Sequence, residues 1–432
     1  MADELDIVII GAGLSGLSAA VQCALSGHSV TVLESTKELA EVGAGLQLTP
    51  NSTKLLQRWG VYDTIKDKVC EVTAMTVLNY KGKILAHEDN FSQNMRRKYG
   101  APFSDCHRVD LQQALAKRAQ ELGVNLVLNA RVIRIDCGAH PGDEATVITA
   151  AGQGYIADLV LGADGLWSMC RSTLLGNHDP PQPTGDLAYR IVLNIEQIQD
   201  QNLREMVQQQ SCRYWAGPDS QAVAFSLRGG TMYNVALVTP DDLDEGVSRS
   251  EGNIGELREI FSAWDPALTQ LLSCVSTVDK WKLMHRSPLD SWINAQSNLV
   301  LIGDSCHPML PYLAQGANSS IEDGAVLGLV LSPDHGFRNR SQLPRTLKLF
   351  EDLRKARSES IASETFKQRK DFHLRDGPEQ EARDELMLGM LQSGQVEAPF
   401  PSRSTCPEVQ GWLYGYDAMQ EVSAATKCLS PL

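Results

Sequence analysis

The stretch Asp6–Glu34, DIVIIGAGLSGLSAAVQCALSGHSVTVLE, decides the fold. Ile7–Ile10 is a short β-branched run of the kind found in buried parallel strands. Leu14–Leu25 carries apolar residues at helical spacing, and Gly27 ends that helix. A second strand follows and closes on Glu34. The stretch therefore predicts a strand, a turn, a helix and a strand, the first part of a dinucleotide-binding fold.

The turn of this unit has the spacing G-x-G-x-x-G. The first glycine allows a tight turn, the second lets a pyrophosphate approach the backbone, and the third lets helix and strand pack closely. The free N–H groups and positive end of the helix would attract the phosphates. The residues expected around them are Gly11, Gly13, Leu14, Ser15 and Gly16. Glu34 would accept hydrogen bonds from an adenosine ribose, which suits FAD or NAD and disfavours a 2'-phosphate.

The composition is that of a folded enzyme. The 432 residues fit two domains, or one domain with an insertion, and 43% hydrophobic and 21% charged residues are typical of globular proteins. The 39 basic and 53 acidic side chains give a formal net charge of -14, so we expect no nucleic-acid partner.

The cysteines and the N-terminus bear on metals and location. The ten cysteines form no C-x-x-C pair and no Cys/His ligand spacing, which argues against a metal site and a disulfide-rich scaffold. The N-terminus is acidic, and no run approaches the roughly 20 apolar residues that cross a bilayer. We therefore expect a cytoplasmic protein without a membrane partner.

Two later stretches repeat the order of strand, turn and helix. ADLVLGADGLWSMCRSTLLG, residues 157–176, predicts a strand, a turn at Asp164 and Gly165, and a helix. SNLVLIGDSCHPMLPYLAQGANSSIEDGAVLGLVL, residues 297–331, predicts a strand, a proline-bounded loop and a helix that starts near Gly316. At the end of that strand, Asp304 can accept hydrogen bonds from the ribityl chain of a flavin. A nicotinamide cofactor has no ribityl chain, so this stretch favours FAD.

In this order the three stretches resemble the single-component FAD-dependent aromatic hydroxylases, the class of salicylate hydroxylase and para-hydroxybenzoate hydroxylase. The resemblance covers nearly the whole chain. It includes EVGAGLQLTPNS (41–52), CHRVDLQQAL (106–115), LAYRIVLN (187–194), RYWAGP (213–218) and LFEDLRKARSESI (349–361). GPEQEARDELM and WLYGYDA, near the C-terminus, are similar to the fungal salicylate hydroxylase-like branch.

The resemblance implies a bound FAD and a transient NAD(P)H. Ala44 and Gly45 would lie near the cofactor, and Arg108 would contact its pyrophosphate and ribityl region. Asp164 and Gly165 match a pair associated with both FAD and NAD(P)H. The flavin end would be held by Asp304, Pro311, Gly316, Ala317 and Asn318.

The resemblance also implies a reaction. NAD(P)H would reduce the flavin, O2 would add at its C4a carbon, and the distal oxygen of the hydroperoxide would pass to an electron-rich ring. This chemistry needs a closed apolar pocket. Arg190 is the leading catalytic candidate, because a guanidinium can hold a phenolate and so activate the ring, although a salt bridge at the strand end is the alternative. Tyr214 is a second candidate, able to donate to the same oxygen or simply to pack.

The expected fold class is α/β. A Rossmann-like FAD-binding domain (1–75, 101–178 and 288–370) would be interleaved with a mostly antiparallel β-sheet substrate domain (76–100 and 179–287). Residues 371–432 would form a helical C-terminal cap. The single glycine motif argues against a second Rossmann domain for NAD(P)H.

The expected function is an FAD-dependent monooxygenase that uses NAD(P)H and O2 to hydroxylate a phenolic or other electron-rich aromatic small molecule, in secondary metabolism or aromatic catabolism. Alternatives are an indole or alkene epoxidase of the same class and an FAD-dependent oxidase or dehydrogenase. The protein would be a monomer or a homodimer.

Overall fold

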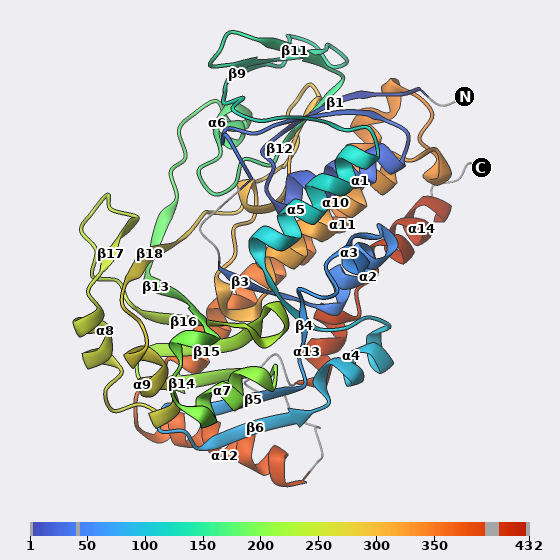
Figure 1. Ribbon diagram of the computed structural model, residues 1–432. Helices are drawn as coiled ribbons and strands as arrows, with labels where there is room; N and C mark the ends of the chain where they lie inside the picture. Colours follow the sequence, from blue (N-terminus) through green and yellow to red (C-terminus); the bar gives the residue numbers. More distant parts are fainter. Residues whose placement is uncertain (1–2, 40–43, 394–405, 429–432) are drawn as a thin grey trace.

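Five parallel strands form the sheet that carries the glycine turn (Figure 1). The computed structural model describes residues 3–39, 44–393 and 406–428. The strand order is β19 (Leu299–Leu301), β12 (Leu159–Gly162), β1 (Asp6–Ile10), β2 (Ser29–Leu33) and β8 (Asn125–Val127). These strands are mostly buried because their residues are apolar on both faces. The predicted Rossmann-like sheet is therefore confirmed.

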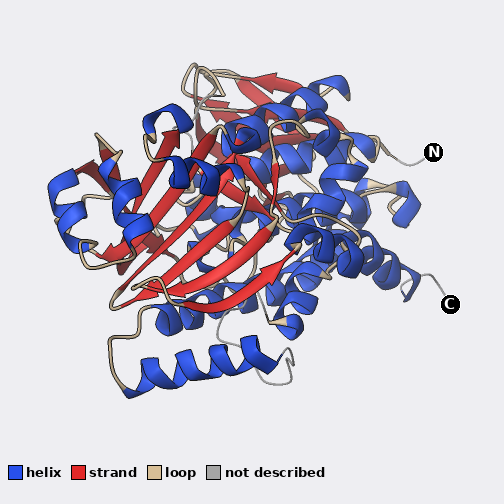
Figure 2. Cartoon of the chain, turned by 60° about the horizontal axis from the view of Figure 1, so that its bottom comes forward, coloured by secondary structure: helices blue, strands red, loops and turns tan. Residues whose placement is uncertain are grey.

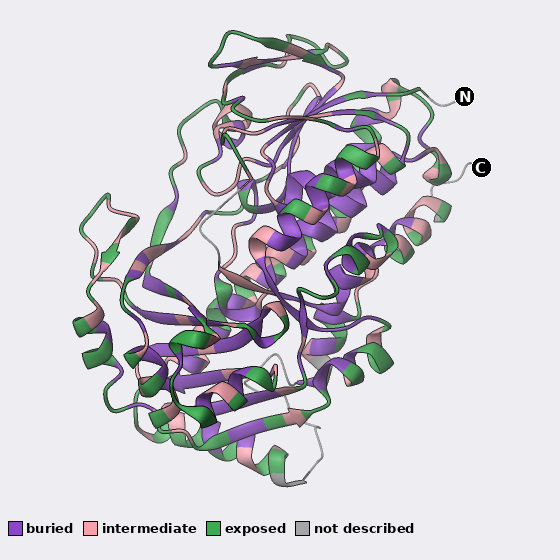
Figure 3. Cartoon of the chain, in the orientation of Figure 1, coloured by how far each residue is buried: buried purple, intermediate pink, exposed green. Residues whose placement is uncertain are grey.

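Three helices pack closely around this sheet: α1 (Leu14–Leu25), α5 (Arg108–Glu121) and α10 (Gly316–Val330). The helix α1 has the bounds that the sequence predicts. Helix α10 is buried along nearly its whole length, and Figure 3 shows the buried residues gathered on these central elements. Two glycines allow α1 and α10 to approach: a Cβ on Gly324 would lie 2.5 Å from the backbone nitrogen of Ala19, and one on Gly328 would lie 2.6 Å from Gln22.

An eight-stranded sheet forms the second layer, seen as the broad set of strands in Figure 2. Its order is β17 (Arg249–Gly252), β18 (Val278–His285), β13 (Gln182–Asn194), β16 (Met232–Pro240), β15 (Ser220–Leu227), β14 (Cys212–Gly217), β5 (Ala74–Asn79) and β6 (Ile84–Asp89). All neighbours are antiparallel except β14 and β5. The predicted, mostly antiparallel sheet is confirmed, and it draws its strands from two separate segments of the chain.

The register of this sheet brings together side chains on one face. Arg190 pairs with Ala236, Ala236 pairs with Val223, and Val223 pairs with Tyr214. Paired residues in adjacent strands point to the same side of a sheet. The row from Arg190 to Tyr214 therefore crosses four strands on a single face.

Two small sheets and further helices complete the fold. The small sheets have the orders β3 (Gly45–Leu48), β7 (Ser104–His107), β4 (Cys70–Glu71) and β11 (Gly154–Ala157), β10 (Ala145–Thr149), β9 (Val132–Asp136). The remaining α-helices are α2 (Pro50–Arg58), α3 (Val61–Thr64), α4 (Phe91–Tyr99), α6 (Met169–Leu175), α7 (Gln201–Gln208), α8 (Ile254–Ile260), α9 (Pro266–Ser273), α11 (Leu343–Phe372), α12 (Pro378–Ser393), α13 (Pro407–Tyr414) and α14 (Ala418–Cys428). The C-terminal region is helical, as predicted. Nowhere in the described ranges does a helix combine the length and apolar character needed to span a bilayer.

The contact between α1 and α10 gives a test of packing. Gly324→Ala should lower the stability of the holoprotein by about 1–3 kcal/mol, because the new methyl group overlaps the backbone of α1. Gly389→Ala in α12 is the matched control, since its Cβ would meet no described atom within 4 Å. The control should stabilise the protein slightly, by up to about 1 kcal/mol. Thermal unfolding measures both, and equal melting temperatures for the two variants would contradict the packing described.

Candidate active site

A cavity of about 300 Å³ lies where the carboxyl ends of the parallel strands meet the eight-stranded sheet. Ligands of open α/β sheets bind in this crevice, beyond the carboxyl ends of the strands. One wall consists of residues after β1, β12 and β19 and at the start of α10: Gly13, Leu14, Ser15, Ala163, Gly165, Asp304, Gly316 and Ala317. The other wall is the sheet face, with Arg190, Val223, Phe225, Asn234 and Ala236. Ala44, Gly45, Arg108 and Pro311 also line the cavity.

The three glycines of the turn meet three different constraints. Gly11 has a φ of +105°, and its Cβ would lie 2.4 Å from the carbonyl oxygen of Ala163. A Cβ on Gly16 would lie 2.0 Å from the carbonyl oxygen of Gly11, so this glycine permits the packing of helix on strand. Gly13 faces the cavity, and its Cβ would meet no described atom within 4 Å. The open side at Gly13 leaves room for a phosphate beside the backbone.

Two predicted cofactor residues use their carboxylates to hold local turns. Glu34 accepts the N–H of Ala12 at 2.8 Å and that of Thr36 at 2.8 Å. Asp164 accepts the backbone N–H groups of Met169 at 2.8 Å and Cys170 at 3.0 Å, at the start of α6. Gly165 is the member of the Asp164–Gly165 pair that lines the cavity.

Asp304 points into the cavity from the turn after β19. The protein atoms around the cavity desolvate its carboxyl and raise its pKa, while the charges of His307 and Arg108 act in the opposite direction. The preceding Gly303 has a φ of +64°, and a Cβ there would lie 2.8 Å from Ser15. The turn thus places the Asp304 carboxyl near the start of α1, and the hydroxyl groups of a polyol in the cavity could donate hydrogen bonds to it.

A fully buried carboxylate fixes this turn to α10. Asp323 accepts the N–H of Gly303 at 2.9 Å and the Nε–H of Arg354 at 2.8 Å, and His307 donates its Nε2–H to the same carboxylate. Burial opposes ionisation of Asp323, but the charges of His307 and Arg354 outweigh it and hold the pKa below its usual value. Burial also opposes the charged form of His307, and Asp323 still raises the pKa of that imidazole. These charges therefore stabilise one another inside the protein.

The start of α10 presents its positive end to the cavity through Gly316 and Ala317. Asn318, one residue further, is buried and faces β3 instead. Its Nδ2 donates to the carbonyl oxygen of Gln47 at 2.9 Å, and its Oδ1 accepts the N–H of Thr49 at 3.0 Å. Asn318 therefore holds the β3 segment against the helix.

The two predicted catalytic residues occupy different depths. Arg190 lines the cavity, and its guanidinium carbon lies 5.5 Å from the ring centroid of Trp281. Tyr214 is buried beside the cavity, further along the same sheet face, where its hydroxyl donates to Oε1 of Gln47 at 2.6 Å. Gln47 itself lines the cavity, so Tyr214 reaches the site through this amide.

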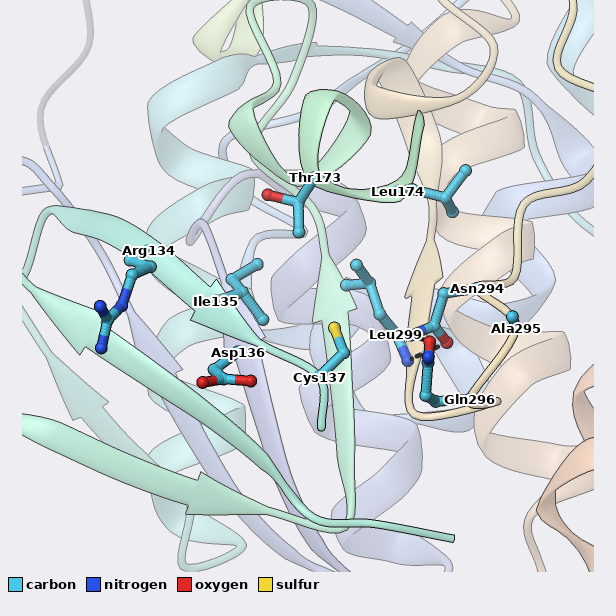
Figure 4. Close-up of a pocket in the computed structure, with 10 residues that line it drawn as sticks. All are labelled: Arg134, Ile135, Asp136, Cys137, Thr173, Leu174, Asn294, Ala295, Gln296 and Leu299. Atoms are coloured by element: carbon cyan, nitrogen blue, oxygen red, sulfur yellow. Dashed lines mark hydrogen bonds between the residues drawn. The ribbon is translucent and has the colours of Figure 1, made fainter. Parts of the chain in front are cut away.

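A second cavity, of about 630 Å³, adjoins the first. The two share Ala44, Arg108, Arg190, Asp304, Met309 and Pro311. The second cavity is also lined by two indoles, Trp167 and Trp281, and the guanidinium of Arg249 lies 4.1 Å from the ring centroid of Trp281. A further hollow between β9, α6 and the segment before β19 (Figure 4) has no lining residue in common with either cavity.

The first cavity suits FAD. An open glycine approach and a helix N-terminus can receive phosphates, Asp304 can accept hydrogen bonds from the ribityl chain, and the α10 amides can face an electron-rich ring edge. A comparison with known families matches residues 4–334 to the FAD binding domain family. The chain belongs to this family.

Proteins of known name resemble the chain over more than nine-tenths of its length. The FAD-dependent monooxygenase OpS4 of Beauveria bassiana is 47% identical over 426 residues, which cover 98% of this chain and 97% of OpS4. A 3-hydroxybenzoate 6-hydroxylase of Klebsiella oxytoca is 30% identical over 397 residues, 91% of this chain and 95% of that protein. A salicylate hydroxylase solved with its substrate has the same fold, with a TM-score of 0.77 at 21% identity and coverage of 98% of both chains. The chain is an FAD-dependent monooxygenase of this family.

Several residues that line the cavity are not predicted from the sequence, among them Gln47 and Asn234. Gln47 and Asn234 are polar residues within strand-like runs, where a polar side chain usually indicates the solvent face. In the structure the Oδ1 of Asn234 accepts the N–H of Gly45 at 2.9 Å, across a sequence separation of 189 residues. A Cβ on Gly45 would lie 2.6 Å from Phe225, so this contact requires the glycine. No local pattern in the sequence indicates that Gly45 contacts Asn234 and Phe225.

The open face of Gly13 gives a test of FAD binding. Gly13→Val should leave the apoprotein folded, because its backbone is extended and the site has room, but should weaken FAD binding at least about tenfold by blocking the phosphate approach. Fluorescence titration of apoprotein with FAD measures this. Gly154→Val on β11, whose Cβ also meets no described atom, is the matched control and should keep wild-type affinity. Unchanged affinity in Gly13→Val would contradict the assigned approach.

Proposed function

We propose that this chain hydroxylates an aromatic small molecule with a phenolic or comparable electron-donating group, with NAD(P)H as reductant and O2 as oxygen source. The observation that carries the proposal is the cavity itself. One wall carries the groups that would face the flavin, namely the glycine turn, Asp304 and the start of α10. The other wall is a mostly apolar sheet face with the guanidinium of Arg190 at its edge. The name of the 3-hydroxybenzoate 6-hydroxylase, at 30% identity, supports an aromatic substrate.

Arg190 is the proposed substrate-activating residue. Its guanidinium remains charged across the working pH range, so it can hold a phenolate or carboxylate oxygen at the cavity wall. Holding the phenolate lowers the pKa of the phenol and makes its ring a better nucleophile. The neighbouring indole of Trp281 limits the directions in which this side chain can swing.

The apolar wall has the role of keeping water out. Val223, Phe225 and Ala236 from the sheet and Met309 and Leu310 from the loop after β19 surround the cavity. FAD, when bound, would supply the redox chemistry: NAD(P)H and the aromatic substrate would each give two electrons to O2, with one oxygen atom entering the product and the other leaving as water. A dry cavity favours this outcome over release of hydrogen peroxide.

The second cavity is the proposed docking place of the nicotinamide cosubstrate. It shares Asp304 and Arg190 with the first cavity, so a nucleotide there would lie next to the flavin. Trp281 and Trp167 offer indole surfaces to a planar ring, and Arg108 and Arg249 offer charge to a diphosphate. These features support binding of an anionic dinucleotide in a chain whose overall charge is -14.

The function is tested by isotope transfer. Wild-type protein supplied with FAD, NAD(P)H, 18O2 and a panel of phenols and hydroxybenzoates should give a product that carries one 18O atom. Arg190→Ala should retain FAD but lose coupled hydroxylation by roughly 100-fold, because the phenolate loses its counter-charge. Mass spectrometry and NAD(P)H consumption measure these results.

Arg375→Ala is the control for this experiment, since Arg375 is a surface residue paired with Asp219. Full coupled activity in Arg190→Ala would remove Arg190 from the catalytic set. A product without 18O, formed with stoichiometric hydrogen peroxide, would identify an oxidase and contradict the proposal.

The docking of NAD(P)H is tested separately. Trp281→Leu should raise the KM for NAD(P)H roughly tenfold by removing a stacking surface, while the affinity for FAD stays unchanged. Trp412→Leu is the matched control. The indole of Trp412, on α13, also lies near an arginine, with Arg357 5.8 Å from its ring centroid, but Trp412 lines neither cavity. Equal KM values in both variants would exclude the second cavity as the docking place.

A further inference from the structure

A buried acid, Asp105, lies close to the cavity but does not line it. Asp105, on β7, has no solvent exposure. One carboxyl oxygen accepts the Nε2–H of Gln47 at 3.1 Å, and the other has no hydrogen-bond partner among the described residues. An ionised carboxylate with a bare oxygen in such a place would be strongly unfavourable.

Among the described residues, the surroundings of Asp105 contain polar groups but supply no charge to it. The titratable groups that face it are Cys70 on β4, Cys106 on β7, Cys212 and Tyr214 on β14, and Tyr233 on β16. Burial raises the pKa of each, that of Cys70 to about 12, so all five are neutral. Burial likewise raises the pKa of Asp105 well above its usual value, and the hydrogen bond from Gln47 opposes this only in part.

Asp105 is linked to the cavity by one amide. Nε2 of Gln47 donates to Asp105 at 3.1 Å and to the sulfur of Cys212 at 3.3 Å, so both of its N–H groups are used. Oε1 of the same amide accepts the hydroxyl proton of Tyr214 at 2.6 Å. The proton of Tyr214 is therefore committed to Gln47, and Tyr214 can only accept further hydrogen bonds.

We propose that Asp105 is a positioning residue which, as a neutral acid, fixes the Gln47 amide in the cavity wall and thereby sets the direction of the Tyr214 hydroxyl. This inference rests on the proposed function, because the wall it orders is the one that would face flavin and substrate. Asp105 contacts neither of them and acts through Gln47. When the Gln47 amide has one fixed orientation, the cavity wall keeps one conformation. Coupling of NAD(P)H oxidation to hydroxylation requires such a fixed cavity.

The first test follows the proton without any turnover. Unfolded Asp105 ionises near pH 4, whereas the folded protein keeps it protonated, so folding takes up a proton above about pH 4. Wild-type stability is then lost as pH rises toward the folded pKa. Asp105→Asn has the same shape and no proton to take up. The melting temperature of Asp105→Asn minus that of wild type should therefore increase steadily from about pH 5 to about pH 8.

The second test concerns the wall. Asp105→Leu removes the acceptor for Gln47, and coupled turnover should fall roughly tenfold, with more hydrogen peroxide released per NAD(P)H. Asp105→Asn retains an acceptor and should stay close to wild type. Should Asp105→Leu fail to fold, Gln47→Leu breaks the same link from the other side and should show the same uncoupling. Asp352→Asn, an exposed aspartate on α11, is the control for loss of a carboxylate.

The outcomes separate this inference from the proposed function. If the difference in melting temperature between Asp105→Asn and wild type does not change with pH, Asp105 is not a neutral acid in the folded protein. This conclusion holds even if the protein hydroxylates its substrate normally. Wild-type coupling in both Asp105→Leu and Gln47→Leu overturns the positioning role. A pH-dependent difference in a protein that never incorporates 18O supports the neutral acid and contradicts the proposed function alone.

Discussion

The ion pairs of Asp323 hold the turn after β19 and helix α11 against helix α10. This carboxylate has no contact with solvent and binds the backbone of Gly303, the imidazole of His307 and the guanidinium of Arg354. Removal of one partner from such a buried pair typically costs about 3–5 kcal/mol, because the remaining charge is left unpaired. The turn that carries Asp304 is thereby tied to the helix that begins at Gly316. The Asp304 carboxyl and the first amides of α10 are therefore held on the same wall of the cavity.

The eight-stranded sheet forms the other wall of the cavity, and the pairing register of its strands decides which side chains lie on that wall. The pairing of β13, β16, β15 and β14 places Arg190, Ala236, Val223 and Tyr214 in one row on one face. Small apolar residues in the middle of the row leave space for a ring, while the polar groups stand at its ends. One side of the site therefore depends on buried charge and the other on strand alignment. A large flat cofactor in this cavity would lie between two preformed surfaces.

The sequence predicts elements that are set by local rules, and misses contacts between distant segments. The bounds of α1 and the three separate constraints on Gly11, Gly13 and Gly16 follow from spacing within a few residues. The bond between Tyr214 and Gln47 spans 167 residues, and its direction depends on Asp105 in a third segment. The sequence predicts Asp164 at the cofactor. In the structure its carboxylate accepts the N–H groups of Met169 and Cys170 at the start of α6, a contact that the turn motif alone does not indicate.

The most direct measurement is a crystal structure of the protein with FAD bound. We expect the isoalloxazine between the Asp304 turn and the sheet row that begins at Arg190, with its electron-accepting edge toward the amides of Gly316 and Ala317. A flavin ring found outside this crevice, or a crevice closed by side chains in the FAD-bound protein, would contradict this placement.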